Sequence, residues 1–384
     1  MRVCLVYDCL YPHTVGGAER WYRNLAERLR DEGHDVTYLT LRQWNRGDDP
    51  GIEGVDVVSV GPRMALYGPG GNRRILPPLV FGAGVLWHLL RQPRSFDVVH
   101  TASFPYFSLL AAAALRRFGA YTLVTDWHEV WSASYWREYL GRLGWVGEAV
   151  QRLCARASQR AFCFSHLHAD RLRALGLRSQ PTVLRGEWAG ALGRPEPAPA
   201  TSVAVFAGRL IAEKQAPALV GAIAAAVASR PELRGTIYGD GPDRDAVHAA
   251  IETHDAANLV SAPGFVDADE LAEALRHALC LVLPSRREGY GLVVVEAASV
   301  GVPSIVVAGP DNAAVELLEE GVNGFVAPSA GPGDLSRAIL AVADAGPALR
   351  ESTADWFGEH SGELSLGRSL ARVLEGYADA SARL

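Results

Sequence analysis

Short strand-like runs alternate with helical segments along almost the whole chain, and this alternation limits the folds open to it. In the first half, apolar runs rich in β-branched or aromatic residues begin near residues 3, 35, 55, 96, 121 and 160. In the second half, similar runs begin near residues 202, 235, 259, 279, 303 and 323. Strands that alternate with helices are typical of a parallel sheet covered on both faces. The pattern predicts an α/β protein with doubly wound parallel sheets.

The length of the chain and one proline-rich segment predict two domains. A chain of 384 residues is longer than one hydrophobic core usually supports. The segment GRPEPAPATS, residues 193–202, interrupts the alternation and is typical of a linker. The predicted parts are a first domain at 1–190, a linker at 191–202, a second domain at 203–360 and a C-terminal helix at 361–384 that is free to cross back to the first domain. Gly33 and Gly119 are expected to end the helical segments that precede them.

Charge is divided unevenly between the two halves. Residues 1–194 carry 24 Arg and 17 acids, a net charge of +7, whereas residues 195–384 carry 13 Arg or Lys and 26 acids, a net charge of −13. A basic first half favours an anionic partner, such as a membrane surface or a phosphorylated molecule. A surface composition with no partner explains the same split. Nucleic acid is not predicted, because the arginines are dispersed and no basic-aromatic motif is present.

Residues 75–90, ILPPLVFGAGVLWHLL, form a long apolar stretch. A membrane-spanning helix needs about 20 apolar residues, so the stretch predicts a packed or interfacial helix instead. The N-terminal run RVCLVYD is predicted to be a strand rather than a secretion signal. Five scattered cysteines without metal-ligand spacing indicate reduced thiols. We therefore expect a cytoplasmic protein, with peripheral contact at the inner face of the membrane left open.

Two places where a strand ends and a helix begins carry candidate binding residues. Gly16 and Gly17 lie at the first such turn, where backbone amides can bind an anion, although a plain turn explains them equally. At a later turn, Glu288 precedes the amides of residues 289–292, and Glu296 lies inside the following helix. Those amides can hold a phosphate, and two carboxylates about 10 Å apart can accept hydrogen bonds from sugar hydroxyls. Because an unpaired carboxylate is costly in the apolar run VVVEAA, Glu296 favours a function over a solvated helix position.

The run EGYGLVVVE, residues 288–296, resembles the motif of two acids separated by seven residues in retaining glycosyltransferases of the GT-B fold. The likeness extends over nearly the whole chain and includes VGGAERW at 15–21, FAGRLIAEK at 206–214, YGDGPDRDAV at 238–247 and AVELLEEGVNGFVAP at 314–328. The chain resembles the large family 4 of that class, the glycosyl transferases of group 1. The resemblance implies two Rossmann-like domains facing across a cleft, the first for the acceptor and the second for a nucleotide-sugar donor.

Lys214 is the only lysine in the chain. The resemblance matches Arg209 and Lys214 to the family's pair that contacts the donor diphosphate. A Lys ammonium is a compact point charge and Arg a planar fork, so the two are not interchangeable beside a departing phosphate. The alternative is a surface lysine kept by chance. The cations and the loop amides can stabilise the leaving group without a metal, and the strings at 243–245 and 267–269 are expected helix caps rather than metal ligands.

A second loop, TLVTDWHEVW at 122–131, contains further candidates. The resemblance places a histidine near the donor sugar, and His128 is the best match, although it lies three residues after the Thr rather than two. A histidine buried within the loop is the alternative. The tryptophans at 127, 131, 136 and 145 either stack on a sugar acceptor or belong to the core. His13 and Glu19, beside the first glycine turn, are weaker candidates.

The hypothesis is retaining transfer of a sugar from a nucleotide diphosphate sugar to a hydroxyl acceptor, either a lipid-linked glycan or a small cyclitol or natural product. The catalytic residues assigned are Glu288, His128, Lys214 and Arg209. Donor contacts are assigned to Gly16, Gly17, Arg209, Lys214, Gly264, Val266, Glu288, Gly289, Tyr290, Gly291, Leu292 and Glu296. Acceptor contacts are assigned to Asp126, Trp127, Glu129 and Trp131. The alternatives are an epimerase of the same fold, an inverting transferase and a non-catalytic nucleotide-sugar-binding protein.

Overall fold

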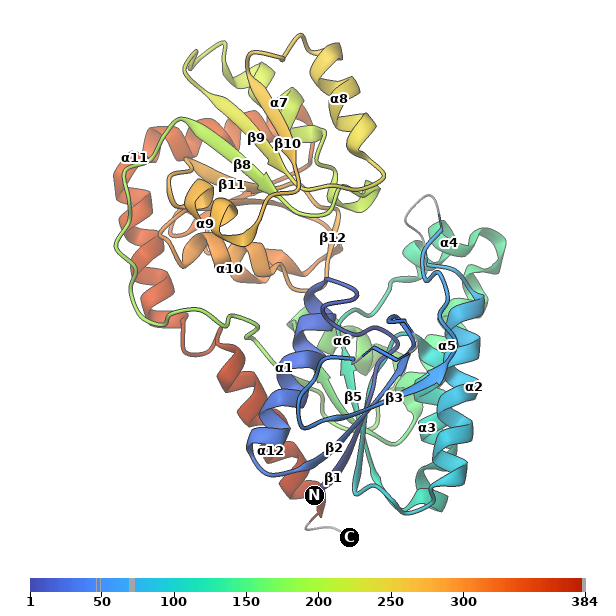
Figure 1. Cartoon of the computed structure of the whole chain (residues 1–384). Helices are drawn as coiled ribbons and strands as arrows, with labels where there is room; N and C mark the ends of the chain where they lie inside the picture. Colours follow the sequence, from blue (N-terminus) through green and yellow to red (C-terminus); the bar gives the residue numbers. More distant parts are fainter. Residues whose placement is uncertain (46, 49, 69–72, 382–384) are drawn as a thin grey trace. The chain divides into compact units, whose positions relative to one another are not determined.

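The computed structural model describes residues 1–45, 47–48, 50–68 and 73–381, and these form two compact units. The first unit contains residues 1–68, 73–185 and 367–381 of the described chain, and the second contains residues 186–366. Each unit is built on a parallel sheet with helices on both faces (Figure 1). The predicted fold class is therefore confirmed.

The sheet of the first unit has the order β3-β2-β1-β4-β5-β6-β7 among the described residues, with every neighbouring pair parallel. Its strands are β1 (Arg2–Val6), β2 (Asp35–Leu41), β3 (Asp56–Gly61), β4 (Val98–Ala102), β5 (Thr122–Trp127), β6 (Arg160–Cys163) and β7 (Thr182–Val183). The central strands are buried almost from end to end, as expected for a sheet covered on both faces. The strand order reverses beside β1, and in such sheets ligands bind at the carboxyl ends near that point.

Helices of the first unit cover both faces of this sheet (Figure 1). They are α1 (Gly17–Asp31), α2 (Leu76–Arg91), α3 (Tyr106–Gly119), α4 (Ala133–Leu140), α5 (Gly144–Arg156), α6 (His166–Leu175) and α12 (Leu366–Ser381). In Figure 1, α1 and α12 lie against one face, and α2 and α3 against the other. The C-terminal helix α12 thus packs on the sheet formed by the N-terminal part of the chain.

The second unit has the sheet order β10-β9-β8-β11-β13-β15 among the described residues. Its strands are β8 (Val203–Ala207), β9 (Arg234–Tyr238), β10 (Val260–Gly264), β11 (Cys280–Leu283), β13 (Ser304–Val307) and β15 (Gly324–Ala327), with the separate short pair β12 (Arg287–Glu288) and β14 (Asp311–Asn312). Its helices are α7 (Ala218–Ala226), α8 (Arg244–Thr253), α9 (Ala268–Arg276), α10 (Leu292–Ala298) and α11 (Pro332–His360), with the 3₁₀ turns η2 (Ala212–Lys214) and η3 (Ala313–Leu317).

Every strand expected from the apolar runs is present, but three short strands were not predicted. β7, β12 and β14 have two residues each, which is too short to give a periodic pattern. The predicted end of α3 at Gly119 is confirmed, but the glycine is not the left-handed residue there. Gly119 is the last residue of α3, and Ala120 takes the left-handed conformation with φ 54°. Gly119 is instead required for packing, because an added Cβ would lie 2.3 Å from the ring of Tyr121.

The apolar stretch at 75–90 forms α2, which is packed on one side and exposed on the other. Phe81, Val85 and Leu89 are buried, whereas Leu76 and Trp87 are exposed by 60% and 58%. Across the part of the chain that the structure describes, no helix combines the length and apolar character needed to cross a bilayer. The interfacial or packed helix expected from the stretch agrees with this geometry.

Gly84 allows α2 to pack closely on β3, and this contact predicts the effect of a larger residue on stability. A Cβ at Gly84 would lie 2.0 Å from the carbonyl oxygen of Val60, so Gly84→Ala should lower the free energy of unfolding by about 1–3 kcal/mol. Gly367→Ala, in α12, is the matched control because a Cβ added there would meet nothing within 4 Å; alanine at that position should stabilise by about 0.5–1 kcal/mol. Chemical denaturation of both variants checks this, and a more stable G84A protein would contradict the packing.

Candidate active site

Glu288 is held at the carboxyl edge of the second unit's sheet by a short parallel pair of strands. In β12 and β14, Glu288 pairs with Asn312 and Arg287 with Asp311. The Asn312 amide donates to the carbonyl oxygens of Ser285 (2.9 Å) and Val307 (2.8 Å), which ties the pair to the ends of β11 and β13. Only 7% of Glu288 is exposed, so its carboxylate occupies a defined position.

Lys214 and Glu288, two of the predicted catalytic residues, contact each other directly. Lys214 Nζ lies 2.5 Å from Glu288 Oε1, with exposed side-chain fractions of 24% and 8%. Lys214 ends η2, and η2 is joined to the loop before β12 because the amide of Arg286 donates to the carbonyl of Glu213 at 3.0 Å. Lys214 and Glu288, both assigned to the donor site from the sequence, therefore lie together, and their opposite charges are paired.

The loops after β8, β9 and β10 lie side by side through backbone contacts. The Gly208 amide donates to the carbonyl of Tyr238, and the Gly239 amide donates to that of Gly264 at 2.8 Å. Gly239 has φ 136°, and a Cβ there would lie 1.9 Å from the Gly208 carbonyl oxygen. This close approach explains why the first glycine of the run YGDG, Gly239, has no side chain. It also brings together the loops that carry Arg209, Gly264 and Val266.

The loop that leads into α10 turns through a left-handed glycine. Gly291 has φ 99°, and a Cβ there would lie 2.7 Å from that of Ala314. Gly289 is half-buried and Tyr290 is buried, while α10 begins at Leu292. Glu296 is half-buried in the second turn of α10, as the sequence predicted. The helix and loop are therefore confirmed, and their ligand contacts remain predictions.

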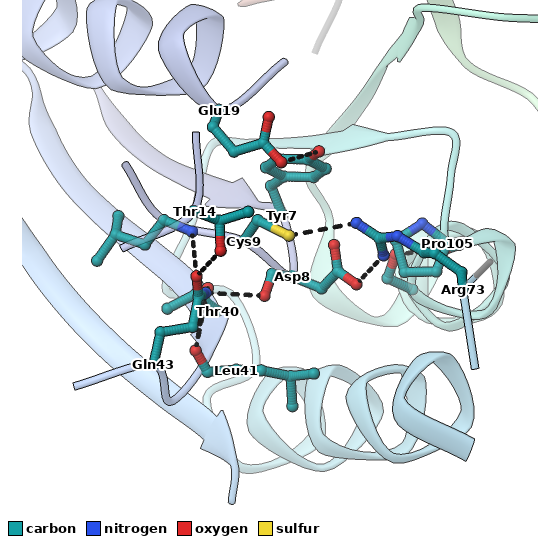
Figure 2. Close-up of polar contacts among 12 residues, drawn as sticks. Tyr7, Asp8, Cys9, Thr14, Glu19, Thr40, Leu41, Gln43, Arg73 and Pro105 are labelled. Carbon is teal, nitrogen blue, oxygen red and sulfur yellow. Dashed lines mark hydrogen bonds and ion pairs between the residues drawn. The ribbon is translucent and has the colours of Figure 1, made fainter. Parts of the chain in front are cut away.

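In the first unit, the predicted glycine turn at Gly16 and Gly17 lies against the carboxylate of Glu19, in the first turn of α1. Gly16 precedes α1 in an extended conformation, and Gly17 is its first residue. A Cβ at Gly16 would lie 2.4 Å from Glu19 Oε2, and Tyr7 Oη donates to Glu19 Oε1 at 3.3 Å (Figure 2). Glu19 is 6% exposed. In this conformation the Glu19 carboxylate occupies the space beside Gly16, so a side chain at position 16 would displace it. The sequence analysis did not foresee this contact.

A buried ion pair next to this turn was missed by the sequence analysis. Asp8, two residues after the end of β1, is fully buried and pairs with Arg73, whose Nη2 also contacts Cys9 Sγ at 3.2 Å (Figure 2). The Arg73 guanidinium lies over the rings of Tyr67 and Phe104 at 5.3 and 5.4 Å. An acid at the end of a buried strand was a usable signal for Asp8, whereas nothing in the sequence marks Arg73 as its partner.

Asp126 is at the centre of a buried polar network. Its carboxylate lies 2.8 Å from His100 Nε2 and accepts a 2.6 Å hydrogen bond from the Trp21 indole. His100 Nδ1 is 2.5 Å from Tyr377 Oη, which links α12 to β4 and β5. Burial alone would raise the pKa of Asp126, but His100, His128 and Trp21 outweigh it and the pKa is lowered. Asp126 is therefore an ionised residue whose two oxygens are both engaged inside the unit.

His128 lies beyond this network, and its Nε2 nitrogen is buried without a hydrogen-bond partner among the described residues. Its ring stacks on Phe164 with centroids 4.6 Å apart and planes within 8°. Burial lowers the pKa of His128, while Asp126 and Glu129 act in the opposite direction. A neutral imidazole with a free nitrogen can exchange a hydrogen bond with a hydroxyl group.

The other predicted acceptor residues divide into interior and partly exposed groups. Trp127 is fully buried and its indole donates to Gln159 at 3.0 Å, so with Asp126 it supports the loop from within and offers no surface for stacking on an acceptor. Trp131 is half-buried and donates to Glu129 Oε2 at 2.8 Å. His13 borders a pocket of about 560 Å³ that Arg20 and Arg23 also line.

The two DxD strings lie at helix starts, as expected. Asp267 caps α9 by accepting from the amide of Glu270 at 2.9 Å, whereas Asp243 occupies the cap position of α8 without a side-chain cap bond. Within the described ranges, no group of three or more His, Cys, Asp or Glu side chains is arranged to hold a metal ion.

Comparison with protein families assigns both parts of the chain. Residues 15–184 match the model described as Glycosyltransferase Family 4, and residues 194–354 match the one described as Glycosyl transferases group 1. The glycogen synthase of Mycobacterium tuberculosis is 28% identical over 369 residues, covering 89% of this chain and 85% of that protein. The α-D-kanosaminyltransferase of Streptomyces kanamyceticus is 25% identical over 208 residues, covering 54% of this chain and 51% of that protein.

Solved structures agree on the fold. Sucrose-phosphate synthase from Thermosynechococcus elongatus superposes with a TM-score of 0.78 at 18% identity and covers all of both chains. Anabaena Alr3699/HepE, solved in complex with UDP, gives a TM-score of 0.74 at 18% identity and covers 99% of this chain and 100% of that chain. With both units matched, the chain belongs to the glycosyltransferases of family 4, the glycosyl transferases of group 1, and has their GT-B fold.

Proposed function

We propose that this glycosyltransferase moves a sugar from a nucleoside diphosphate sugar to a hydroxyl acceptor with retention of anomeric configuration. The observation that carries the proposal is the contact between Lys214 and Glu288. It brings a cation suited to a diphosphate next to a carboxylate suited to sugar hydroxyls. The structure of a relative with the same fold, Alr3699/HepE, contains UDP-glucose, which supports a donor of this class.

The second unit would bind the donor through the loops at one edge of its sheet. Arg209 and Lys214 stabilise the diphosphate, and the loop residues Gly289, Tyr290, Gly291 and Leu292 supply backbone amides. Glu288 and Glu296 accept hydrogen bonds from donor hydroxyls. The backbone at Gly264 and Val266 meets the nucleotide base. Since Lys214 is already paired, a bound diphosphate would share its ammonium with Glu288.

The first unit would bind the acceptor and contribute to the reacting centre. The His128 Nε2 nitrogen is buried and unpartnered, so it would bond a sugar hydroxyl once neighbouring side chains move to admit the sugar. Glu129 and Trp131 are the remaining candidates for acceptor contact. Gly16 and Gly17 approach the donor phosphate, which requires Glu19 to turn away from the start of α1. The acceptor is a lipid-linked glycan or a small cyclitol or natural product.

The proposed mechanism retains the anomeric configuration and uses neither a metal nor a separate protein base. When the anomeric carbon leaves the diphosphate, negative charge develops on the leaving oxygen, where Arg209 and Lys214 stabilise it. The acceptor would attack from the same face and give its proton to that oxygen. We also propose that the enzyme works in the cytoplasm, with its basic first half, of net charge +7, at the membrane surface.

Removal of the ammonium tests the central assignment. Lys214→Ala should reduce kcat by about 10²–10³-fold, the usual loss when one preorganised charge-stabilising group is removed. Lys214→Arg should also be impaired, because a planar fork does not replace a point charge at this position. Steady-state transfer assays measure both, with Glu252→Gln on the outer helix α8 as the control. Near-wild-type turnover of K214A would contradict the role of Lys214.

Loss of activity must be separated from loss of folding. Lys214→Ala leaves the buried Glu288 carboxylate unpaired, which costs about 3–5 kcal/mol of stability in other buried pairs. The double variant K214A/E288Q removes both charges and should recover most of that stability while remaining inactive. Recovery of activity in the double variant would assign the pair a structural role only.

Donor identity can be read from ligand-induced stabilisation. A ligand that binds only the folded state at 100 times its Kd stabilises it by about 2.7 kcal/mol. Among UDP-, GDP-, ADP- and dTDP-sugars, we expect one nucleotide to raise the Tm clearly, and Glu288→Gln to reduce that rise. Product analysis by NMR then gives the anomeric configuration. Inversion, or isomerised donor without transfer, would overturn the proposed mechanism.

A further inference from the structure

The outward face of α2 is apolar along its whole length. Positions three or four residues apart lie on one side of a helix. The exposed large side chains of this helix follow that spacing: Leu76 (60% exposed), Leu79 (42%), Leu86 (37%), Trp87 (58%) and Leu90 (42%). Contiguous apolar surface of this kind marks a site that contacts a protein or a membrane.

The sequence around this face contains basic residues and no acids. Residues 57–96 include five arginines and no Asp or Glu. α3, which packs on α2, also contains no acid; it carries Arg116 and Arg117 and ends next to the exposed Phe118. Asp56, at the start of β3, interacts electrostatically with His88 of α2, so the border of the apolar face is mainly rather than wholly basic. An apolar face with a mainly basic border is complementary to a bilayer that has an apolar interior and anionic headgroups.

Arginines lie at both ends of the apolar face. Arg74 is exposed just before α2, and Arg91 and Arg94 are exposed at its end. The Arg91 guanidinium lies 4.3 Å from the centre of the Trp87 ring. Trp and Arg are suited to the headgroup region of a bilayer, because each has an apolar body and a polar end.

A neighbouring helix extends the same kind of surface. α5 packs on α3, so α2, α3 and α5 lie on the same side of the first unit's sheet (Figure 1). The N-terminal part of α5 and the turn before it expose Leu143 by 61% and Trp145 by 67%, with Arg142 beside them. Exposed apolar side chains are therefore shared by two helices with α3 between them, although α5 also carries Glu148, which pairs with Arg152.

We propose that the outward face of α2 docks on an anionic lipid bilayer, with its leucines and Trp87 in the acyl boundary and its arginines at the headgroups. This inference names the surface that makes the membrane contact and rests on that part of the proposed function. It does not depend on the chemistry of sugar transfer. A helix of 16 residues lies in the interface rather than across the membrane. A second copy of the chain fits less well, because a two-fold contact brings the same arginines together.

Vesicle flotation tests the proposal with matched variants. The wild-type protein should bind vesicles of phosphatidylcholine mixed with phosphatidylglycerol, bind pure phosphatidylcholine less, and dissociate at high salt. The double variant Leu76→Glu, Trp87→Glu should bind the anionic vesicles at least about tenfold more weakly, because two large apolar side chains no longer enter the membrane. Arg91→Gln should weaken binding by about fivefold. Leu192→Glu, at an equally exposed leucine (59%) of the second unit, should bind like the wild type.

The possible results distinguish the membrane-binding role of the α2 face from the proposed transfer chemistry. A glutamate at position 76 lies in the first turn of α2, where an acid is favourable, so an unchanged Tm shows that the double variant is folded. Failure of the wild type to bind anionic vesicles would overturn the membrane contact and leave transfer untouched. Equal binding by the wild type and the double variant would overturn the α2 face alone. Loss of dimers by the double variant in sedimentation velocity, without vesicle binding, would assign the face to self-association. Donor hydrolysis without lipid reports on the proposed chemistry independently.

Discussion

The ion pair between Lys214 and Glu288 is the interaction on which the donor site depends. Its carboxylate is almost completely buried, so it needs a cation at that position in the folded protein. Two segments far apart in the chain, η2 and the β12–β14 pair, are arranged to meet this need. A buried pair of this kind contributes little net stability compared with apolar packing. Its value lies in orientation, because both groups are positioned before any ligand arrives.

Glycines allow the loops around this pair to pack closely. Gly239, Gly264 and Gly291 all have positive φ angles, between 97° and 136°. At Gly239 and Gly291 a side chain would collide with the neighbouring loop, so the backbone itself forms the edge of the site. In the first unit the same edge is organised differently, through the buried carboxylates of Asp8 and Asp126. Their partners come from distant parts of the chain, and Tyr377 connects the C-terminal helix to the same network.

Sequence reasoning predicted the elements well because their signals are local. Each long strand follows an apolar run, and the spacing of Glu288 and Glu296 around Gly291 identified the loop and helix correctly. Sequence reasoning failed to predict contacts between residues that lie far apart in the chain. Arg73 shows no local pattern and reaches Asp8 only in the folded unit. Trp127 looked available to an acceptor because sequence distance does not reveal that its indole turns inward to Gln159.

The structure of the enzyme bound to an intact nucleoside diphosphate sugar would test the central claim most directly. The account predicts that a diphosphate oxygen lies within hydrogen-bond distance of Lys214 Nζ and that a hydroxyl of the sugar donates to the Glu288 carboxylate. A diphosphate bound elsewhere, with the pair of Lys214 and Glu288 remote from every ligand atom, would contradict it.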